Sequence, residues 1–229
     1  MFRKIYTCIS VAIIALAIFF GGAFGVGVQT YVAQAQSNAN EKIISFVSNL
    51  DLHSDASIDL SETIVYDFGS NDRHGIFRVL RTNNADGKEM GVTLKSVTDE
   101  NHSPYNYTTS KGNDGLTIKI GDANVLISGV HTYVISYTIT NVATYFDDHD
   151  EFTWNVVGSD WEVPILSASA TMVLPSGVDV SKITYSCYRG TYGATGTCAN
   201  KKLENSIVSF SDNDLDAEIN LTVSVGVPK

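Results

Sequence analysis

Apolar and polar residues alternate along most of this 229-residue chain, and this period of two constrains the fold more than any other feature. Successive side chains of a β-strand point to opposite faces of a sheet, so the alternation predicts strands with one buried face. The clearest runs are residues 57–68, 116–120, 133–139, 152–156, 168–174 and 217–225. Residues typical of turns separate the runs, at 84–87, 112–115, 121–124 and 175–177.

These short strands predict an all-β fold, an antiparallel β-sandwich that forms a single domain over residues 41–229. The mixed polarity of the strand faces argues against a parallel α/β sheet, whose strands are apolar on both faces. About 190 residues can bury a core without help, and no Pro/Ser-rich linker divides them.

The start of the chain resembles an export signal. Arg3 and Lys4 precede an uncharged run over residues 5–28, and the small-x-small motif Ala33-Gln34-Ala35 follows it. Residues 1–35 are therefore a predicted signal peptide, with residues 36–40 as a short lead-in. The run approaches the roughly 20 residues that span a bilayer, so an uncleaved membrane anchor is the alternative. Either case places the remainder on the extracytoplasmic side of the cell membrane, and a cleaved chain without a further anchor would be secreted.

The chain is acidic, with 25 Asp and Glu against 15 Lys and Arg and a formal charge of −10. Loss of the first 35 residues removes two basic side chains and leaves −12. A polyanion would be repelled, and the longest basic cluster is Lys201-Lys202, so we expect no nucleic-acid partner. Solubility explains the acidity.

Cysteine usage agrees with export. Cys8 falls within the signal, which leaves Cys187 and Cys198 in the remainder of the chain. Two cysteines in an oxidising compartment predict one disulfide across a glycine-containing loop. A metal pair or redox-active thiols would require closer spacing or further ligands.

Glu62 lies on the apolar face of its predicted strand, between Leu60 and Ile64. A carboxylate there is costly unless a cation or several donors meet it. The turn after residue 68 would bring a basic segment back toward this strand, and its members are Arg73, His74 and Arg78. An internal pair between Glu62 and an arginine is the structural interpretation, and a ligand-facing site is the alternative.

A second segment gathers acids, imidazole and indole over residues 145–155. Its candidate ligand-binding residues are Asp148, His149, Glu151, Trp154 and Asn155. Alternating carboxylates could hold Ca²⁺, but no glycine interrupts the acidic run as in known calcium loops. Zinc would require His74, His149 and an acid from separate segments. We predict a solvated, partly paired loop, and neither a metal nor a cofactor.

Acid pairs with exposed tryptophans also raise the hypothesis of glycoside hydrolysis. Glu62 with Glu151 would supply the acids, and Trp154 with Trp161 the stacking rings. Any acidic β-protein offers such pairs, and no G-x-S-x-G nucleophile motif is present. We therefore expect no enzyme.

Six blocks of the chain resemble, in order and spacing, the N-terminal domain of the predicted membrane proteins grouped as domain of unknown function 2207 (DUF2207). The blocks are residues 62–68, 73–78, 120–122, 129–137, 154–158 and 161–165. The resemblance covers nearly all of residues 41–227, and the loop between Cys187 and Cys198 fits it. The matching pattern is densest at Glu62, His74, Arg78, Asp148, Glu151, Trp154, Asn155 and Trp161.

The resemblance implies an architecture. Family members carry a signal peptide, this extracytoplasmic β-domain, transmembrane helices and a cytoplasmic portion. Because no second apolar span precedes Lys229, we expect either a piece of a longer membrane protein or a member without that anchor. The family has no established function, so no catalytic residue is carried over.

The leading hypothesis is a non-enzymatic sensory or interaction domain of a bacterial cell-envelope protein. Its partners would be the membrane and another envelope protein. The alternative is a secreted metal- or carbohydrate-binding protein, with hydrolase activity as one form of it.

Overall fold

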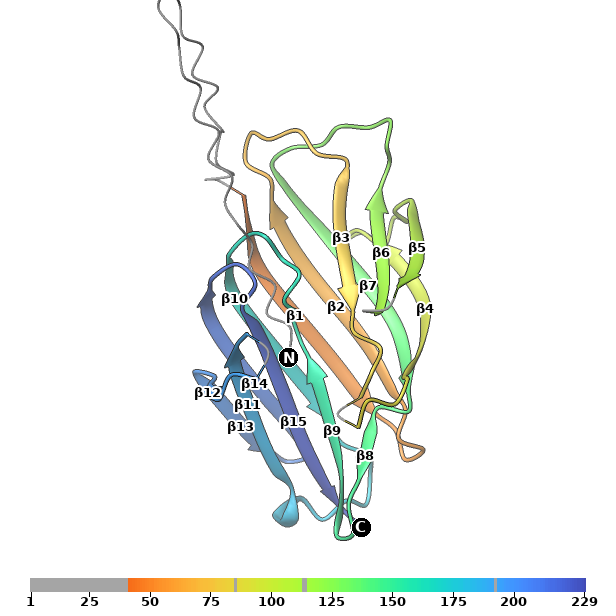
Figure 1. Ribbon diagram of the computed structural model, residues 1–229, viewed down its shortest axis with the longest axis vertical. Helices are drawn as coiled ribbons and strands as arrows, with labels where there is room; N and C mark the ends of the chain where they lie inside the picture. Colours follow the sequence, from red (N-terminus) through yellow and green to blue (C-terminus); the bar gives the residue numbers. More distant parts are fainter. Residues whose placement is uncertain (1–40, 85, 113–114, 192) are drawn as a thin grey trace, which may run out of the picture. The chain divides into compact units, whose positions relative to one another are not determined.

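The computed structural model describes residues 41–84, 86–112, 115–191 and 193–229. The predicted signal or anchor, residues 1–35, and the lead-in, residues 36–40, lie outside the described residues. Strands make up most of the described chain, which confirms the predicted all-β class (Figure 1). The helical content of these residues is one 3₁₀ turn, η1 (Val180–Lys182). None of the described residues forms a helix of the length and apolarity that crossing a membrane requires.

The largest sheet has seven strands and forms one layer of the fold. In order across the sheet they are β13 (Asn200–Glu204), β14 (Ile207–Leu215), β10 (Ile165–Val173), β1 (Lys42–Leu52), β2 (Ile58–Asp67), β7 (Val130–Thr140) and β4 (Gly91–Thr98). The predicted runs around residues 57–68, 133–139 and 168–174 are all in this sheet.

Two smaller sheets form the opposite layer. The five-stranded sheet has the order β12 (Gly196–Thr197), β11 (Thr184–Gly190), β15 (Asn220–Pro228), β9 (His149–Asn155) and β8 (Ala143–Tyr145). The three-stranded sheet has the order β3 (Gly75–Leu80), β6 (Gly115–Gly121) and β5 (Tyr107–Gly112). In Figure 1 these strands lie in front of the seven-stranded sheet.

The two layers enclose one apolar core. Strand β2 shows why, since its burial alternates strictly from Ile58 to Asp67 and its apolar side chains face the smaller sheets. Tyr137 of β7 and Trp154 of β9 contact each other across the layers, with ring centroids 6.4 Å apart. The arrangement is therefore a β-sandwich, as predicted.

One strand pair is parallel in this otherwise antiparallel fold. Strand β1 pairs antiparallel with β2 and parallel with β10, where Ile43 lies opposite Ile165. A register shift between Ile43 and Ser45 interrupts β1 near its start. The expectation of an antiparallel sandwich therefore holds for every strand pair in the described residues except β1 with β10.

Candidate functional site

Glu62 and Arg78 form an ion pair at the centre of the core. Glu62 is completely buried on β2, and the Arg78 side chain on β3 is 2% exposed. The guanidinium Nη2 and Nε donate to Glu62 Oε1 and Oε2 at 2.6 and 2.8 Å. The hydroxyl of Tyr137 donates to Oε1 at 2.7 Å. The predicted internal pair is present, and Arg78 is the arginine that makes it.

Backbone carbonyls complete the surroundings of Arg78. Nη1 donates to the carbonyl oxygens of Val79 and Val157, at 3.1 and 2.7 Å, and Nη2 donates to that of Val156 at 3.0 Å. All five N–H donors of the guanidinium therefore have acceptors, which a buried arginine requires. Gly158 closes the site with φ +77°, and a Cβ there would lie 2.9 Å from Nη1.

The protonation states of this cluster follow from burial and charge. Burial alone lowers the pKa of Arg78, but the charge of Glu62 and its hydrogen bonds more than offset this, so the pKa is raised. Burial, followed by the charge of Glu62, raises the pKa of Tyr137 well above its usual value. Tyr137 therefore stays a hydrogen-bond donor, and the cluster is a fixed structural element at neutral pH.

Arg73 and His74 contact other groups than Glu62. Nη2 of Arg73 lies 2.7 Å from Oε1 of the buried Glu41, and the Tyr66 hydroxyl donates to Oε2 at 3.0 Å. Burial and this hydrogen bond raise the pKa of Tyr66. Nδ1 of His74 lies 2.9 Å from the carbonyl oxygen of Val125, in the β6–β7 connection. Arg73 and His74 therefore hold the β2–β3 connection against Glu41 and against the β6–β7 connection, at one end of the sandwich.

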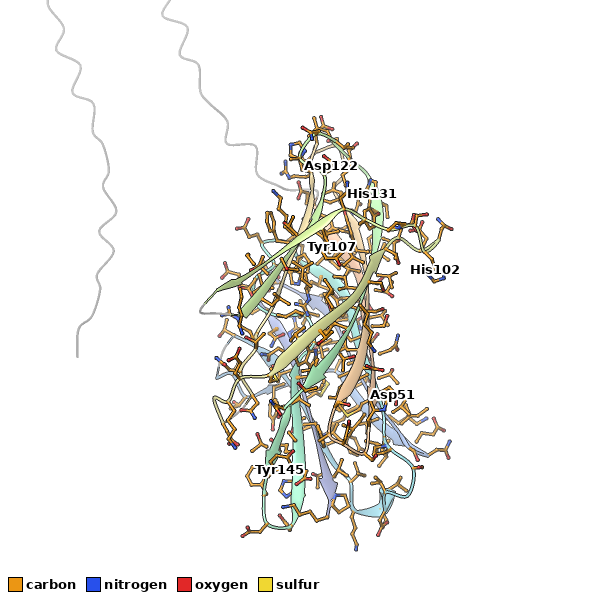
Figure 2. The ribbon with its side chains drawn as sticks, turned by 90° about the vertical axis from the view of Figure 1, so that its right-hand side faces the viewer. Asp51, His102, Tyr107, Asp122, His131 and Tyr145 are labelled. Atoms are coloured by element: carbon orange, nitrogen blue, oxygen red, sulfur yellow. A yellow bond between two sulfur atoms is a disulfide. The ribbon has the colours of Figure 1, made fainter. Side chains whose placement is uncertain are left out.

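The acidic segment lies at the other end. Figure 2 shows Tyr145, in the β8–β9 hairpin, far from Asp122, whose carbonyl oxygen His74 also contacts at 3.2 Å. In this hairpin His149 pairs with Asp148 at 2.7 Å and lowers the pKa of that carboxyl. The hypothetical zinc site of His74 with His149 is therefore wrong. Within the described ranges, no group of three His, Cys, Asp or Glu residues is placed to hold a metal ion.

The remaining candidates belong mainly to the core. Trp154 and Trp161 are 3% and 7% exposed, so the expectation that these rings are exposed for sugar stacking is wrong. Trp161 donates its indole N–H to the carbonyl of Val157 at 2.8 Å. Glu151 is half-buried on β9 and accepts from Thr153 Oγ1 at 3.2 Å. Since Glu62 is enclosed, it and Glu151 do not form an accessible acid pair.

Asn155 lines a cavity of about 760 Å³, which we call the polar cavity. Its lining residues come from the end of β3 with the β3–β4 connection, from β9 and β15, and from the β11–β12 hairpin. Most lining side chains carry amide or hydroxyl groups, among them Thr82, Asn84, Thr153, Asn155, Ser159, Asn220 and Thr222. The charged side chains that line it are Arg78, Arg81 and Arg189.

A hydrogen-bond network fixes the amide of Asn155. The N–H of Gly158 donates to Asn220 Oδ1 at 2.8 Å, so Asn220 presents Nδ2 to its neighbours. This Nδ2 donates to Asn155 Oδ1 and to Thr222 Oγ1, each at 2.8 Å, and Thr222 Oγ1 donates to Asn155 Oδ1 at 2.9 Å. Asn155 therefore uses its oxygen twice and keeps both N–H donors of Nδ2 without a partner among the described residues.

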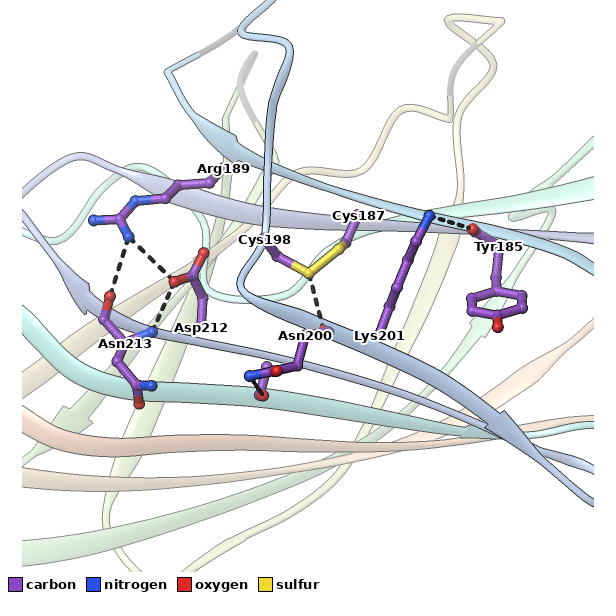
Figure 3. The surroundings of a disulfide bond; sticks show 9 residues. Tyr185, Cys187, Arg189, Cys198, Asn200, Lys201, Asp212 and Asn213 are labelled. Carbon is purple, nitrogen blue, oxygen red and sulfur yellow. Dashed lines mark hydrogen bonds and ion pairs between the residues drawn. A yellow bond between two sulfur atoms is a disulfide. The ribbon is translucent and has the colours of Figure 1, made fainter.

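The predicted disulfide between Cys187 and Cys198 supports the hairpin wall of this cavity. It joins β11 to the segment before β13, with the two Cα atoms 5.5 Å apart (Figure 3). Nearby, Arg189 lies 3.1 Å from Asp212 of β14 and donates to the carbonyl of Asp214 at 2.6 Å. The disulfide thus joins the two arms of the hairpin, and an ion pair connects the hairpin to the seven-stranded sheet.

Sequence reasoning found Asn155 but missed its partners. Asn220 and Thr222 are alternate residues on the outward face of β15, and Thr222 lies directly opposite Asn155. The signal that could have shown them was polar residues alternating with Leu221 and Val223. Pairing of β15 with β9 decides the contact, and the sequence pattern carries no information on that pairing.

The carboxyl of Asp59, on β2 of the seven-stranded sheet, has a lowered pKa that can be tested. Hydrogen bonds from Lys95 and Thr138, both at 2.6 Å, lower the pKa of this carboxyl from 3.8 to about 2. A lowered native pKa stabilises the fold above pH 3.8, and this contribution disappears as the pH falls toward 2. We expect Asp59→Asn to flatten the pH dependence of stability between pH 4 and 2, as measured by urea unfolding. An NMR titration midpoint of Asp59 near 3.8 would contradict the assignment.

A model of the N-terminal domain of the predicted membrane proteins DUF2207 matches residues 42–227. No curated protein matches the chain in sequence.

Among solved structures, native leukotriene A4 hydrolase from Saccharomyces cerevisiae is similar with a TM-score of 0.48 and 13% identity, covering 83% of this chain and 30% of that one. A putative protease from Parabacteroides distasonis is similar with a TM-score of 0.44 and 12% identity, and the match covers 81% of this chain and 40% of the protease. A variant of an M1 zinc metallopeptidase from Deinococcus radiodurans is similar with a TM-score of 0.43 and 8% identity, and the match covers 80% of this chain and 42% of the metallopeptidase. The chain thus spans less than half the length of each of these proteins.

Proposed function

Because the chain belongs to the DUF2207 family of predicted membrane proteins, matching its N-terminal domain, we propose that it is a non-enzymatic recognition domain of a membrane protein. The domain lies on the extracytoplasmic side and uses the polar cavity to bind a small ligand or an exposed group of an envelope partner. The order of Arg3 and Lys4 before an uncharged run supports this sidedness, as does the disulfide, since disulfides persist in oxidising compartments.

The polar cavity is the observation that carries the proposal. Its volume of about 760 Å³ lies within the range of small-molecule sites, about 300–1,000 Å³. The Asn155 network and the Arg78 cluster hold its floor in one arrangement, and the disulfide holds one wall. A site whose polar groups are already fixed loses little entropy when it binds. Amide, hydroxyl and guanidinium groups that are fixed in place are suited to binding a polar ligand.

A screen by NMR tests the proposal on the full chain. We would add neutral sugars, sugar acids, amino acids and short peptides in separate mixtures and follow the backbone amide signals. We expect at least one mixture to shift signals from Asn155, Gly158, Ser159 and Thr222, which line the polar cavity. We also expect the spectra of the added compounds to stay unchanged over hours, because the domain binds without chemistry.

Two outcomes would contradict the proposal. Shifts that are absent, or scattered over both layers, would remove the polar cavity as a binding site. Conversion of an added compound would show an enzyme. A variant with Ser110→Glu, on the exposed strand β5, serves as the control that surface charge alone leaves the response intact.

A further inference from the structure

We propose that the polar cavity binds a carboxylate group, so that the ligand of this domain is a carboxylate-bearing small molecule or chain end. This inference rests on the proposed binding function and adds the chemical class of the ligand.

The first observation is the fixed orientation of Asn155. The chain of hydrogen bonds from Gly158 through Asn220 determines which atom of the Asn155 amide is oxygen, and Thr222 also donates to that oxygen. A reversed Asn155 would place its NH₂ against the NH₂ of Asn220, so the orientation follows from the network. Nδ2 is left as a positioned donor that is accessible to an acceptor from outside the described residues.

The second observation is the charge that the cavity presents. The Arg189 side chain is 37% exposed, whereas its partner Asp212 is 3% exposed and does not line the cavity. Arg78 also lines the cavity, but it is 2% exposed and its five N–H donors already have acceptors, so the accessible positive charge comes from Arg189 and Arg81. Arg81 is 39% exposed and pairs with Asp160, which is 33% exposed. The charges that line this cavity are therefore positive, although the whole chain carries −10.

A carboxylate matches both features. It accepts hydrogen bonds and donates none when ionised, and it carries the charge that arginines favour. A neutral hydroxyl could also accept from Asn155 Nδ2, but it lacks the charge that pairs with an arginine. Carboxylates occur on sugar acids and at the ends of peptides, and both sources share the recognised group.

Paired probes test the group and its source on the full chain. N-acetyl-Ala-Ala is compared with its C-terminal amide, and D-glucuronate with D-glucose, by titration with NMR and tryptophan fluorescence. We expect the carboxylate member of at least one pair to bind at least about tenfold tighter than its neutral partner, as loss of a charged hydrogen-bond acceptor implies. The pair that responds identifies the source.

Two variants locate the binding. Asn155→Asp keeps Oδ1 for Asn220 and Thr222 but replaces the donor with a second carboxylate oxygen, so we expect it to weaken binding at least about tenfold. Ser159→Glu places a carboxylate on an exposed lining residue and should weaken binding without depending on the network. Asn101→Asp, in the exposed β4–β5 connection, makes the same change of charge and should bind as the unaltered chain does.

Equal binding of charged and neutral partners would overturn the inference and leave the proposed recognition function standing. No binding by either carboxylate at millimolar concentration, or unchanged binding in both Asn155→Asp and Ser159→Glu, would also overturn it. The recognition function fails separately, when the wider screen shifts no signal of the polar cavity.

Discussion

Replacing Glu62 by alanine should lower the free energy of unfolding by about 3–5 kcal/mol, because removal of one member of a buried ion pair leaves the other charge uncompensated. Arg78 is 2% exposed and would lose two of its five acceptors, and the Tyr137 hydroxyl would lose the carboxylate to which it donates. Urea unfolding followed by tryptophan fluorescence measures the effect. A change below about 1 kcal/mol, which is typical of exposed pairs, would contradict the role of this pair in the core.

Asp59→Ala is the matched control. Asp59 is on the same strand, β2, and makes an ion pair of equal length with Lys95, at 2.6 Å. Both side chains of that pair are more than 40% exposed, so water solvates each charge after the other is removed. We expect a loss of at most about 1 kcal/mol from Asp59→Ala. The contrast between the two variants isolates the effect of burial.

Removing the disulfide should lower the free energy of unfolding by about 3 kcal/mol, because the unfolded chain regains the freedom of the loop. The double variant Cys187→Ala with Cys198→Ala removes the bond between residues 11 positions apart. Urea unfolding of the oxidised protein and of this variant gives the difference. A reductant should lower the stability of the unaltered chain by a similar amount and leave that of the double variant unchanged.

The disulfide also predicts a local effect. Because it supports the hairpin that carries Arg189 and Gly190, its removal should increase hydrogen exchange in β11 and β12 before it affects β2 or β7. Equal exchange in both layers would show that the bond acts on the whole sandwich and not on the wall of the polar cavity.

The strands that the sequence predicts are those with one apolar and one polar face. Strands β2, β7 and β9 alternate without interruption in their central parts, and their burial follows the alternation. Strand β1 was not predicted because its register shifts between Ile43 and Ser45, which breaks the period of two. All six residues of β5 are exposed, so this strand has no apolar face to detect.

The buried pair of Glu62 and Arg78 shows how much of a core contact the sequence pattern can predict. Glu62 on an apolar face requires a cation, and the sequence offers Arg73 and Arg78 in the segment that follows. The deciding signal is the alternation of Ile76, Arg78 and Leu80, which share the buried face of β3. Arg73 precedes β3 and pairs with Glu41.

The polar cavity depends on strand pairing, which periodicity does not specify. Asn155 and Thr222 are opposite each other only because β9 pairs with β15. Arg189 reaches the same cavity from β11, the next strand of that sheet. A period of two assigns each of these side chains to a face but leaves open which strands lie side by side, so the cavity follows from topology.

The parallel pairing of β1 with β10 has a consequence for the order of folding. Ile43 and Ile165 are opposite each other yet about 120 residues apart, and contacts of such separation slow folding. The centre of the seven-stranded sheet stays open until β10 has left the ribosome. Until then one edge of β1 presents unpaired backbone groups, which attract other extended chains. A chain stalled before Ile165 should therefore aggregate or recruit a chaperone, whereas one that extends past Val173 can close its central sheet.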